Sequence, residues 1–197
     1  MSVIAAYYYN AGKRIREIAL DERFEQDEAR SGFCWIALRE PSADELHTLQ
    51  AAYHLHPLAV DNAMHPLCPP KLEVYNDELY IVAQTAELVG DKISYGKTAI
   101  FTGHNHLITA RHGNGGALGN LREQLEASPT LLGKGVDYVL HAILHRIVDQ
   151  YLPIFEMIED DVLAMEKRSI DDFLGRDEVA RIFSLRGELT SFQRTLG

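Results

Sequence analysis

The chain has 197 residues, of which 46% are hydrophobic and 24% charged, so its composition is that of a globular protein and excludes disordered and collagen-like classes. Its formal net charge of -10 argues against nucleic acid as a partner, because phosphate binding needs a basic surface, and fits a protein that collects cations. No apolar run approaches the roughly 18 to 20 residues that span a bilayer, so the chain as given is expected to be soluble.

The first half of the chain predicts short strands that alternate with helices. Runs of β-branched and aromatic residues predict strands at Val3–Tyr9, Arg14–Leu20, Phe33–Leu38, Leu72–Tyr75, Leu79–Ala86, Ile93–Phe101 and His106–Ala110. Sequential strands this close usually pair antiparallel, so we expect a mixed α/β sheet rather than a parallel one.

Two helices are predicted between these strands. The first begins after Pro41, where Ser42 and Glu45 have the S-x-x-E spacing of a capping box. The second fits Pro57 to Met64, because a proline in the first helical turn lacks an N–H that would have no partner there.

The apolar period changes from Val136 onward. Apolar residues at i, i+3, i+4 and i+7 predict one long helix from Val136 to Met165, which Pro153 should kink. A further helix is predicted from near Asp177, with a coiled-coil seam at Ile182, Leu185, Leu189, Phe192 and Leu196. The seam continues to the last residues, so we expect a fragment cut within a helix.

The acidic residues of the long helix suggest contact with cations. Asp149, Glu156 and Asp160 are spaced seven and four residues apart and lie along one face. Like charges at this spacing destabilise a helix, and only Lys167 and Arg168 are near enough in sequence to offset them. A solvated surface is the ordinary interpretation. A surface that faces hydrated Mg²⁺ is the sharper one, because Mg²⁺ keeps its waters and binds through few carboxylates.

A histidine-rich stretch leaves three interpretations open. His54, His56, His65 and Cys68 are the ligand types of a metal-dependent hydrolase, but they flank prolines and no general base stands at motif spacing. A metal site without catalysis and a proline-kinked piece of scaffold are the other two interpretations. For the chain as a whole, a scaffold that only oligomerises through the seam is a further hypothesis. His141 and His145 are one turn apart, but Ala142 occupies the place of a zinc hydrolase's glutamate, so two histidines at the edge of the apolar stripe are the favoured interpretation. "GHNH" at 103–106 is interpreted as a polar turn.

Four stretches, in order, resemble the cytoplasmic N-terminal domain of the CorA family of divalent-cation channels. They read FCWIALREPSADEL, LHPLAVDNAMHPLCPPKLEVYNDELYIV, AIFTGHNHLITARH and DYVLHAILHRIVDQYLPIFEMIEDDVLAMEKR. The resemblance covers nearly all of the chain. It implies a mixed sheet sandwiched by helices, followed by the long acidic helix and the start of a stalk helix. We therefore expect an α/β sandwich domain over 1–133 and a helical segment over 134–197, leading to membrane spans that the sequence does not contain.

The same resemblance implies a function. The chain would be the cytoplasmic ion-sensing and gating domain of a Mg²⁺ (Co²⁺, Ni²⁺) channel-type transporter, a homopentamer of the bacterial inner membrane, and not an enzyme. The alternative within the superfamily is the soluble domain of a ZntB-like zinc transporter. No nucleic acid partner, catalytic residue or cofactor-binding residue is expected.

The resemblance also implies candidate metal ligands. Asp61 matches the family acid that carries a regulatory Mg²⁺ between subunits, with a partner on the neighbouring stalk beyond residue 197. Val60 replaces a frequent family glutamate, and His145 replaces a second-site aspartate. With His65, such imidazoles would favour Co²⁺, Ni²⁺ or Zn²⁺ over Mg²⁺. Glu156 and Asp160 complete the candidate set.

Overall fold

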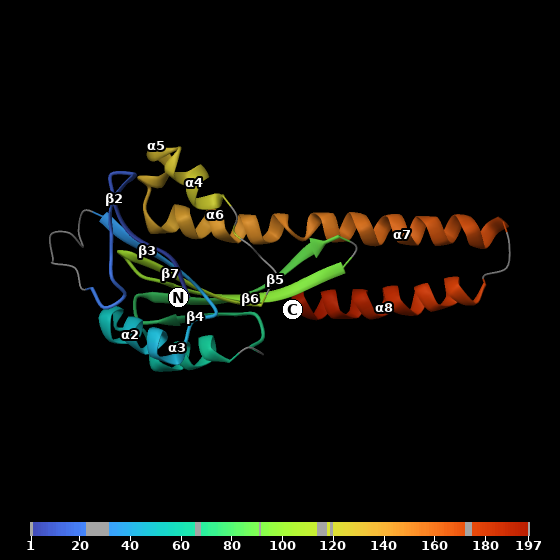
Figure 1. The fold of residues 1–197 in the computed structure, drawn as a ribbon, viewed down its shortest axis with the longest axis horizontal. Coiled ribbons are helices and arrows are strands. Elements are labelled where there is room, and N and C mark those ends of the chain that lie inside the picture. Colours follow the sequence, from blue (N-terminus) through green and yellow to red (C-terminus); the bar gives the residue numbers. More distant parts are fainter. Residues whose placement is uncertain are drawn as a thin grey trace.

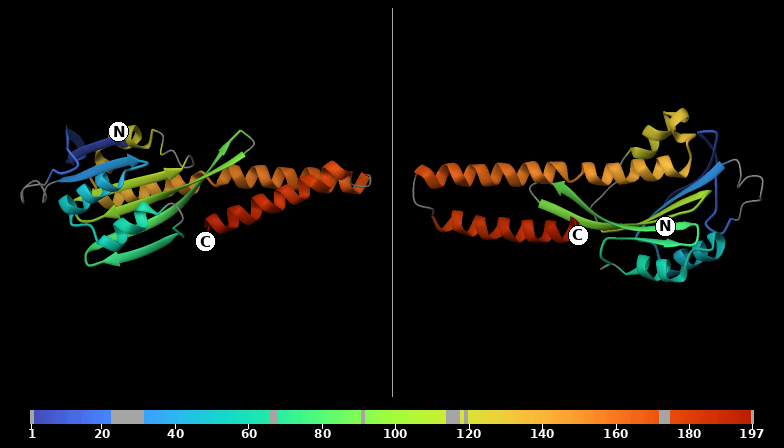
Figure 2. Two further views of the ribbon diagram at one scale, coloured as in Figure 1. Left: turned by 60° about the horizontal axis from the view of Figure 1, so that its bottom comes forward. Right: turned by 180° about the vertical axis from the view of Figure 1, so that it is seen from behind.

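The structure is a computed structural model that describes residues 2–22, 32–65, 68–90, 92–113, 118, 120–171 and 175–196. A sheet and the helices that cover it form one end of the molecule, and two long helices extend from it as an antiparallel pair (Figure 1). The same division is visible from two further directions (Figure 2). Across the described residues, no helix combines the length and the apolar character that a membrane crossing requires.

Within the described residues, seven strands form one mixed sheet in the order β2-β1-β3-β7-β6-β5-β4. The strands are β1 (Val3–Asn10), β2 (Lys13–Glu17), β3 (Gly32–Arg39), β4 (Lys71–Tyr75), β5 (Glu78–Val89), β6 (Lys92–Thr102) and β7 (His106–Gly113). The β3–β7 pair is parallel and the other pairs are antiparallel, which confirms the predicted mixed sheet. The parallel pair arises because β4 to β7 form a meander whose last strand returns beside β3.

Helices cover both faces of the sheet, as the sandwich prediction requires. Alternate residues of β3 point to opposite faces: Cys34 and Ile36 lie in the core under α2 (Ala43–Tyr53) and α3 (Pro57–Met64). Phe33 and Trp35 lie in the other core, under α4 (Leu121–Glu126), α5 (Pro129–Leu132) and α6 (Val136–Asp149). The strand period of two therefore builds two separate hydrophobic cores.

The predicted helix starts are confirmed on the α2–α3 face. The Ser42 hydroxyl accepts a hydrogen bond from the Glu45 N–H at 3.3 Å, and the Glu45 carboxylate accepts one from the Ser42 N–H at 2.8 Å. The α3 helix has the predicted bounds, with Pro57 in its first turn. The α4 and α5 helices were not predicted, because six and four residues are too few to show a helical period.

The predicted single helix from Val136 is two helices. The α6 helix ends at Asp149, and α7 (Leu152–Asp171) continues along nearly the same direction (Figure 1). Pro153 explains the break, since it has no N–H for the Asp149 carbonyl and its ring crowds that carbonyl. The prediction of one long helix kinked at Pro153 was therefore right about the place of the disturbance and wrong about its extent, because the chain forms two helices there.

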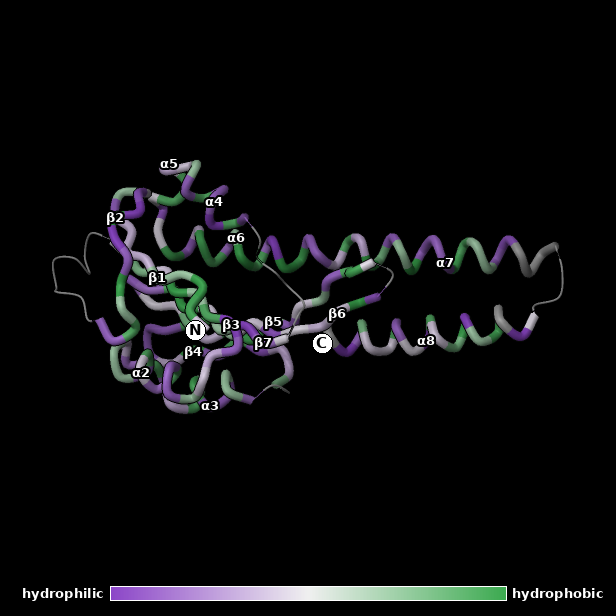
Figure 3. The backbone as a smooth tube through the Cα atoms, in the orientation of Figure 1, coloured by the Kyte–Doolittle hydropathy of each residue, from purple (hydrophilic) through white to green (hydrophobic). Residues whose placement is uncertain are grey.

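The α7 helix pairs with α8 (Arg176–Leu196), and polar and apolar residues alternate along both helices (Figure 3). Leu185 and Phe192 of the predicted seam are buried together with Ile154 and Ile158 of α7 and Ala86 of β5. Ile182 and Leu189 of the same seam remain 39% and 41% exposed. The side chain of the fifth seam residue, Leu196, lies outside what the structure describes. Two of the four seam residues whose side chains the structure describes are thus buried within the chain.

The division at 133/134 stays a prediction. Val139 and Ile143 of α6 belong to the core beneath the sheet, whereas α7 and α8 form the arm beyond it. The segment that begins at residue 134 therefore contributes to both parts of the molecule.

Candidate functional site

The α3 helix presents Asp61 to solvent. Ala59, Val60 and Ala63 are buried against the sheet, so the helical period directs Asp61 and His65 outward. Their side chains are 62% and 67% exposed, and His65 Nε2 lies 3.6 Å from Asp61 Oδ2. Val60 is 1% exposed, so the position where the family often has a glutamate faces the core in this chain.

A buried lysine holds the C-terminal end of α3. Lys97 of β6 is 2% exposed, and its Nζ donates hydrogen bonds to the carbonyl oxygens of Asn62, at 3.3 Å, Ala63, at 3.0 Å, and His65. The last carbonyls of a helix lack partners within the helix and carry partial negative charge, which an ammonium group satisfies. Burial lowers the pKa of Lys97. Sequence reasoning missed this residue, whose only signal was a lysine in the middle of a predicted strand.

The α6 helix presents a second candidate, His145, on the opposite side of the sheet from α3 (Figure 1). His145 Nδ1 lies 2.9 Å from Asp149 Oδ2, and the His141 ring lies 5.9 Å from the His145 ring. These three residues line a cleft of about 400 Å³ between α6 and the short helices α4 and α5. The His145 side chain is 65% exposed and lies beside the buried Ile143 and Ile147 of the apolar stripe.

Glu156 and Asp160 lie exposed on α7. The neighbouring Asp161 forms an ion pair with Arg181 of α8, and Arg181 also lies 3.4 Å from Glu188. A cation twenty positions away in sequence therefore offsets one acid of this helix, which spacing along the sequence does not reveal.

The predicted metal ligands do not converge within one chain. Asp61 and His65 lie over one face of the sheet, His145 over the other, and Glu156 and Asp160 on the arm. Over the described ranges, no group of three or more His, Cys, Asp or Glu side chains is placed to hold a metal ion. A metal site that uses Asp61 must therefore take further ligands from water or from another chain.

The four candidate hydrolase ligands also face different surroundings. His56 stacks on Tyr75 at 3.9 Å, and His65 faces Asp61. Cys68 is buried, and its carbonyl accepts a hydrogen bond from Gln84 at 2.6 Å. His54 ends α2 in the left-handed conformation and lines a separate cavity. A shared metal at these four residues is not supported.

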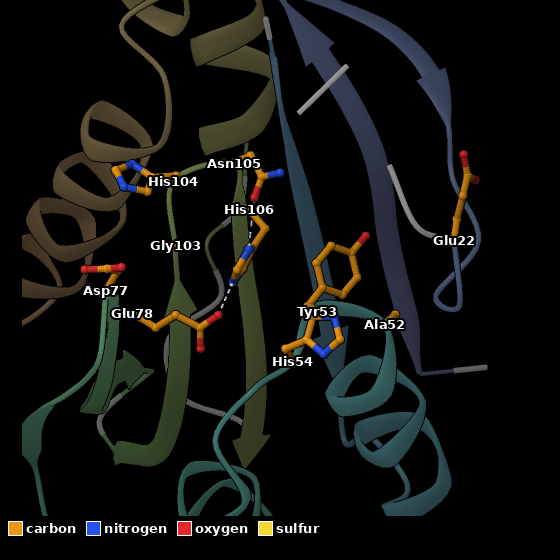
Figure 4. A pocket seen from close by; sticks show the side chains of 10 residues that line it. All are labelled: Glu22, Ala52, Tyr53, His54, Asp77, Glu78, Gly103, His104, Asn105 and His106. Carbon is orange, nitrogen blue, oxygen red and sulfur yellow. Dashed lines mark hydrogen bonds and ion pairs between the residues drawn. The ribbon is translucent and has the colours of Figure 1, made fainter. Parts of the chain in front are cut away.

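That cavity lies where the β4–β5 turn, the β6–β7 turn and the end of α2 meet (Figure 4). It measures about 390 Å³ and surrounds His106, which packs on the Tyr53 ring at 5.3 Å. Burial lowers the pKa of His106 to about 4 and raises the pKa of Glu78. "GHNH" is thus a turn as predicted only up to Asn105, because His106 begins β7 and is buried.

Comparison with known proteins decides the family. The family model described as "CorA-like Mg2+ transporter protein" matches residues 30–197. The chain belongs to the CorA family. That family consists of transporters, which agrees with the expectation that the chain is not an enzyme.

Individual relatives are distant. The chain is 27% identical over 175 residues to the putative metal ion transporter YfjQ of Bacillus subtilis, covering 89% of the chain and 53% of YfjQ. It is 22% identical over 164 residues to the cobalt/magnesium transport protein CorA of Methanocaldococcus jannaschii, covering 82% of the chain and 51% of that protein. The chain thus spans about half the length of these CorA relatives.

The fold is also found in solved structures of similarly low sequence identity. The soluble domain of CorA from Methanocaldococcus jannaschii superposes with a TM-score of 0.73 at 21% identity, covering 100% of the chain and 76% of that domain. This match confirms the predicted CorA soluble-domain fold.

Proposed function

We propose that this chain is the ion-sensing and gating domain of a CorA-type divalent-cation transporter, in which Asp61 supplies a ligand for a regulatory Mg²⁺ between neighbouring subunits. The whole protein would be a homopentamer of the bacterial inner membrane, with this domain on the cytoplasmic side. Mg²⁺ would be sensed and transported, with Co²⁺ and Ni²⁺ as related substrates. His65, His145, Glu156 and Asp160 are further proposed ligands.

The position of Asp61 is the observation that carries this proposal. Its carboxylate is exposed, and the helix beneath it is fixed by three buried residues and by Lys97. A carboxylate on a fixed helix that points away from its own chain suits a ligand shared with a neighbour. Mg²⁺ takes oxygen ligands and keeps several waters, so one carboxylate per subunit is enough.

The net negative charge of the chain also supports a regulatory cation between subunits. Identical subunits with a net charge of -10 repel one another. A divalent cation between two carboxylates replaces that repulsion by attraction. Occupied sites would then favour a closed assembly, and loss of the cation would favour opening.

The test is protease protection of the full-length protein by Mg²⁺. Asp61→Asn should move the Mg²⁺ concentration at half-protection upward by about tenfold, the effect of roughly 1.4 kcal/mol in binding. Glu123→Gln is the matched control, since it removes one exposed charge from α4 on the other face of the sheet. An unchanged midpoint in a folded Asp61→Asn protein would mean that Asp61 is only a surface residue of α3.

A ZntB-like zinc transporter is the second candidate. The ZntB cytoplasmic domain of Vibrio parahaemolyticus superposes with a TM-score of 0.72 at 14% identity, covering 98% of the chain and 73% of that domain, so the fold does not separate the two transporters. The exposed His145 supports this candidate, because imidazole favours Zn²⁺ over Mg²⁺. Uptake of Zn²⁺ without uptake of Mg²⁺ by the full-length protein would select it.

A further inference from the structure

The sheet places Glu78, Gly103 and His106 next to one another at the strand ends. Leu79 pairs with Thr102 across β5 and β6, and Thr102 pairs with Leu107 across β6 and β7. Glu78 precedes Leu79, Gly103 follows Thr102 and His106 precedes Leu107. These three residues therefore form one row across the sheet. The Gly103 N–H also donates to the His106 carbonyl at 3.0 Å.

The side chains in this row share one face. Tyr80 and Ile108, two residues further along β5 and β7, both belong to the core beneath α2 and α3, so Glu78 and His106 point to that side. The glycine between them is required by this arrangement. A Cβ at Gly103 would lie 2.5 Å from His106 Cε1, so a larger residue would displace the ring that reaches toward Glu78.

His106 carries a buried nitrogen without a hydrogen-bond partner. The residue is 6% exposed, and its Nε2 makes no hydrogen bond among the described residues. Glu78 Oε1 is 3.7 Å from Nε2, too far for a hydrogen bond. The close view shows the two side chains pointing toward each other (Figure 4). Asn105 Oδ1 lies 3.4 Å from Nδ1, so the tautomer protonated at Nδ1 turns the Nε2 lone pair toward the carboxylate.

We propose that the cavity binds a divalent transition-metal cation of the Zn²⁺, Co²⁺ and Ni²⁺ class, with His106 Nε2 and the Glu78 carboxylate as its first two ligands. Such a site is separate from Asp61 and differs in the metal it selects. Two acceptors that face each other repel unless a positive charge lies between them. A metal ion supplies that charge without protonating a buried imidazole.

The separation of the two atoms fits this role. Zinc lies about 2.0 to 2.2 Å from imidazole nitrogen and carboxylate oxygen, so two ligands of one ion are roughly 3 to 3.5 Å apart. The observed 3.7 Å therefore needs a movement of a few tenths of an ångström. Mg²⁺ is a poor occupant, because imidazole is a soft ligand compared with the oxygens that Mg²⁺ prefers.

The cavity has further polar side chains and a negative potential. His54, Asp77 and His104 line it from the end of α2 and from the two turns, and all three are exposed. They stand too far apart to join His106 and Glu78 as direct ligands, so water would complete the coordination. No lysine or arginine is among the described residues that line the cavity, although Arg16 neutralises Glu22 at its edge.

The test is a titration of the 197-residue chain with Co²⁺ and Zn²⁺, after removal of metal with a chelator. Absorption bands of bound Co²⁺ report nitrogen and oxygen ligation, and Zn²⁺ binding is followed by the ¹⁵N shifts of the histidine rings. We expect one of the bound ions to shift His106 Nε2 strongly. Glu78→Gln should weaken that site by at least about tenfold, since even groups that only support a ligand cost this much.

A matched variant separates this site from the exposed histidine pair of α6. His141→Gln combined with His145→Gln should leave the His106 shift and its affinity unchanged. His106→Gln should abolish the shift. Gly103→Ala displaces the His106 ring and should weaken binding, so it serves as the test variant where His106→Gln does not fold. The proposal is overturned if Zn²⁺ moves only the His141 and His145 signals, or if Glu78→Gln binds as the wild type does. It is equally overturned if a crystal soaked in Zn²⁺ shows only a water molecule between His106 and Glu78.

Discussion

His106 is held as a neutral imidazole because burial removes the water that would solvate a protonated ring. It is buried between β7 and the Tyr53 ring, and burial lowers its pKa from 6.5 to about 4. Glu78 faces it, and the pKa of that carboxyl is raised by the same loss of water. Both groups therefore disfavour their charged forms in the folded, metal-free chain.

The free energy of unfolding of the metal-free chain should fall as the pH is lowered from 6.5 toward 4. In this range the unfolded chain binds a proton at residue 106 that the folded chain excludes, so stability is fully present above pH 6.5 and is lost through the folded pKa. The shift corresponds to a loss of about 3 kcal/mol at most. Glu78 acts oppositely, because the folded chain binds its proton more readily, and it offsets part of the loss.

Urea unfolding in a chelator at several pH values measures this effect. His106→Gln should flatten the pH dependence, whereas His47→Gln, which changes an exposed histidine of α2, should leave it as in the wild type. A wild-type chain whose stability did not change from pH 6.5 to 4 would contradict a neutral, buried His106.

At the scale of elements, Lys97 joins a strand of the sheet to the helix that carries Asp61. Its ammonium group donates hydrogen bonds to three backbone carbonyl oxygens at the end of α3. Helix ends that are buried without such partners are unfavourable, so this contact fixes both the stability and the orientation of α3.

Lys97→Met should destabilise the chain by about 2 kcal/mol or more, because the buried carbonyls lose their donor. In a chain of this size that corresponds to a fall in Tm of roughly 4 to 8 °C. Amide hydrogen exchange near the end of α3 should accelerate more than exchange in α2. Lys92→Met, at the exposed start of the same strand, should stay within about 0.5 kcal/mol of the wild type. Equal stability of both variants would contradict the anchoring role.

Elements whose signals are local were predicted well. The capping box at Ser42 and the proline at the start of α3 act within a few residues, so the sequence around them decides the structure. The break before Pro153 was placed inside one helix because the apolar period continues across it. The spacing of apolar residues shows which side of a helix is buried. It does not show that the backbone hydrogen bond at Pro153 is missing.

Features that depend on distant contacts were not predictable in this way. The short helices α4 and α5 exist because they cover a sheet face, and Arg181 reaches Asp161 only because α8 folds back on α7. The burial of His106 follows from sheet register, which no local pattern contains. Asp61 was singled out through family resemblance, and its exposure depends on which face of α3 packs on the sheet.

At the scale of the whole molecule, the arm formed by α7 and α8 leaves apolar residues uncovered. Phe183 is 65% exposed, and Leu163 and Phe155 are 55% and 48% exposed. Against this, Leu185 and Phe192 of the seam are already packed within the chain, and the net charge of -10 opposes association. The exposed apolar residues of α7 and α8 therefore form no continuous surface, whereas the net charge makes the chains repel one another.

The isolated chain should consequently be a monomer or a weak oligomer in a chelator. A coiled-coil seam of at most about three heptads is short for stable association, and Leu185 and Phe192 of this seam are already buried within the chain. Sedimentation velocity over a range of protein concentrations measures the state. Raising the concentration of a monovalent salt should strengthen association slightly, because screening reduces the repulsion between chains.

Two variants show whether the arm is the surface responsible. Phe183→Ser should remove whatever association remains at high salt, since it takes away a large exposed side chain of α8. Leu58→Ser, which changes a residue of α3 that is 60% exposed, should not alter it. A stable pentamer in the chelator would contradict the prediction, because it would mean that apolar contacts alone overcome the charge and that no cation is needed to hold neighbouring chains together.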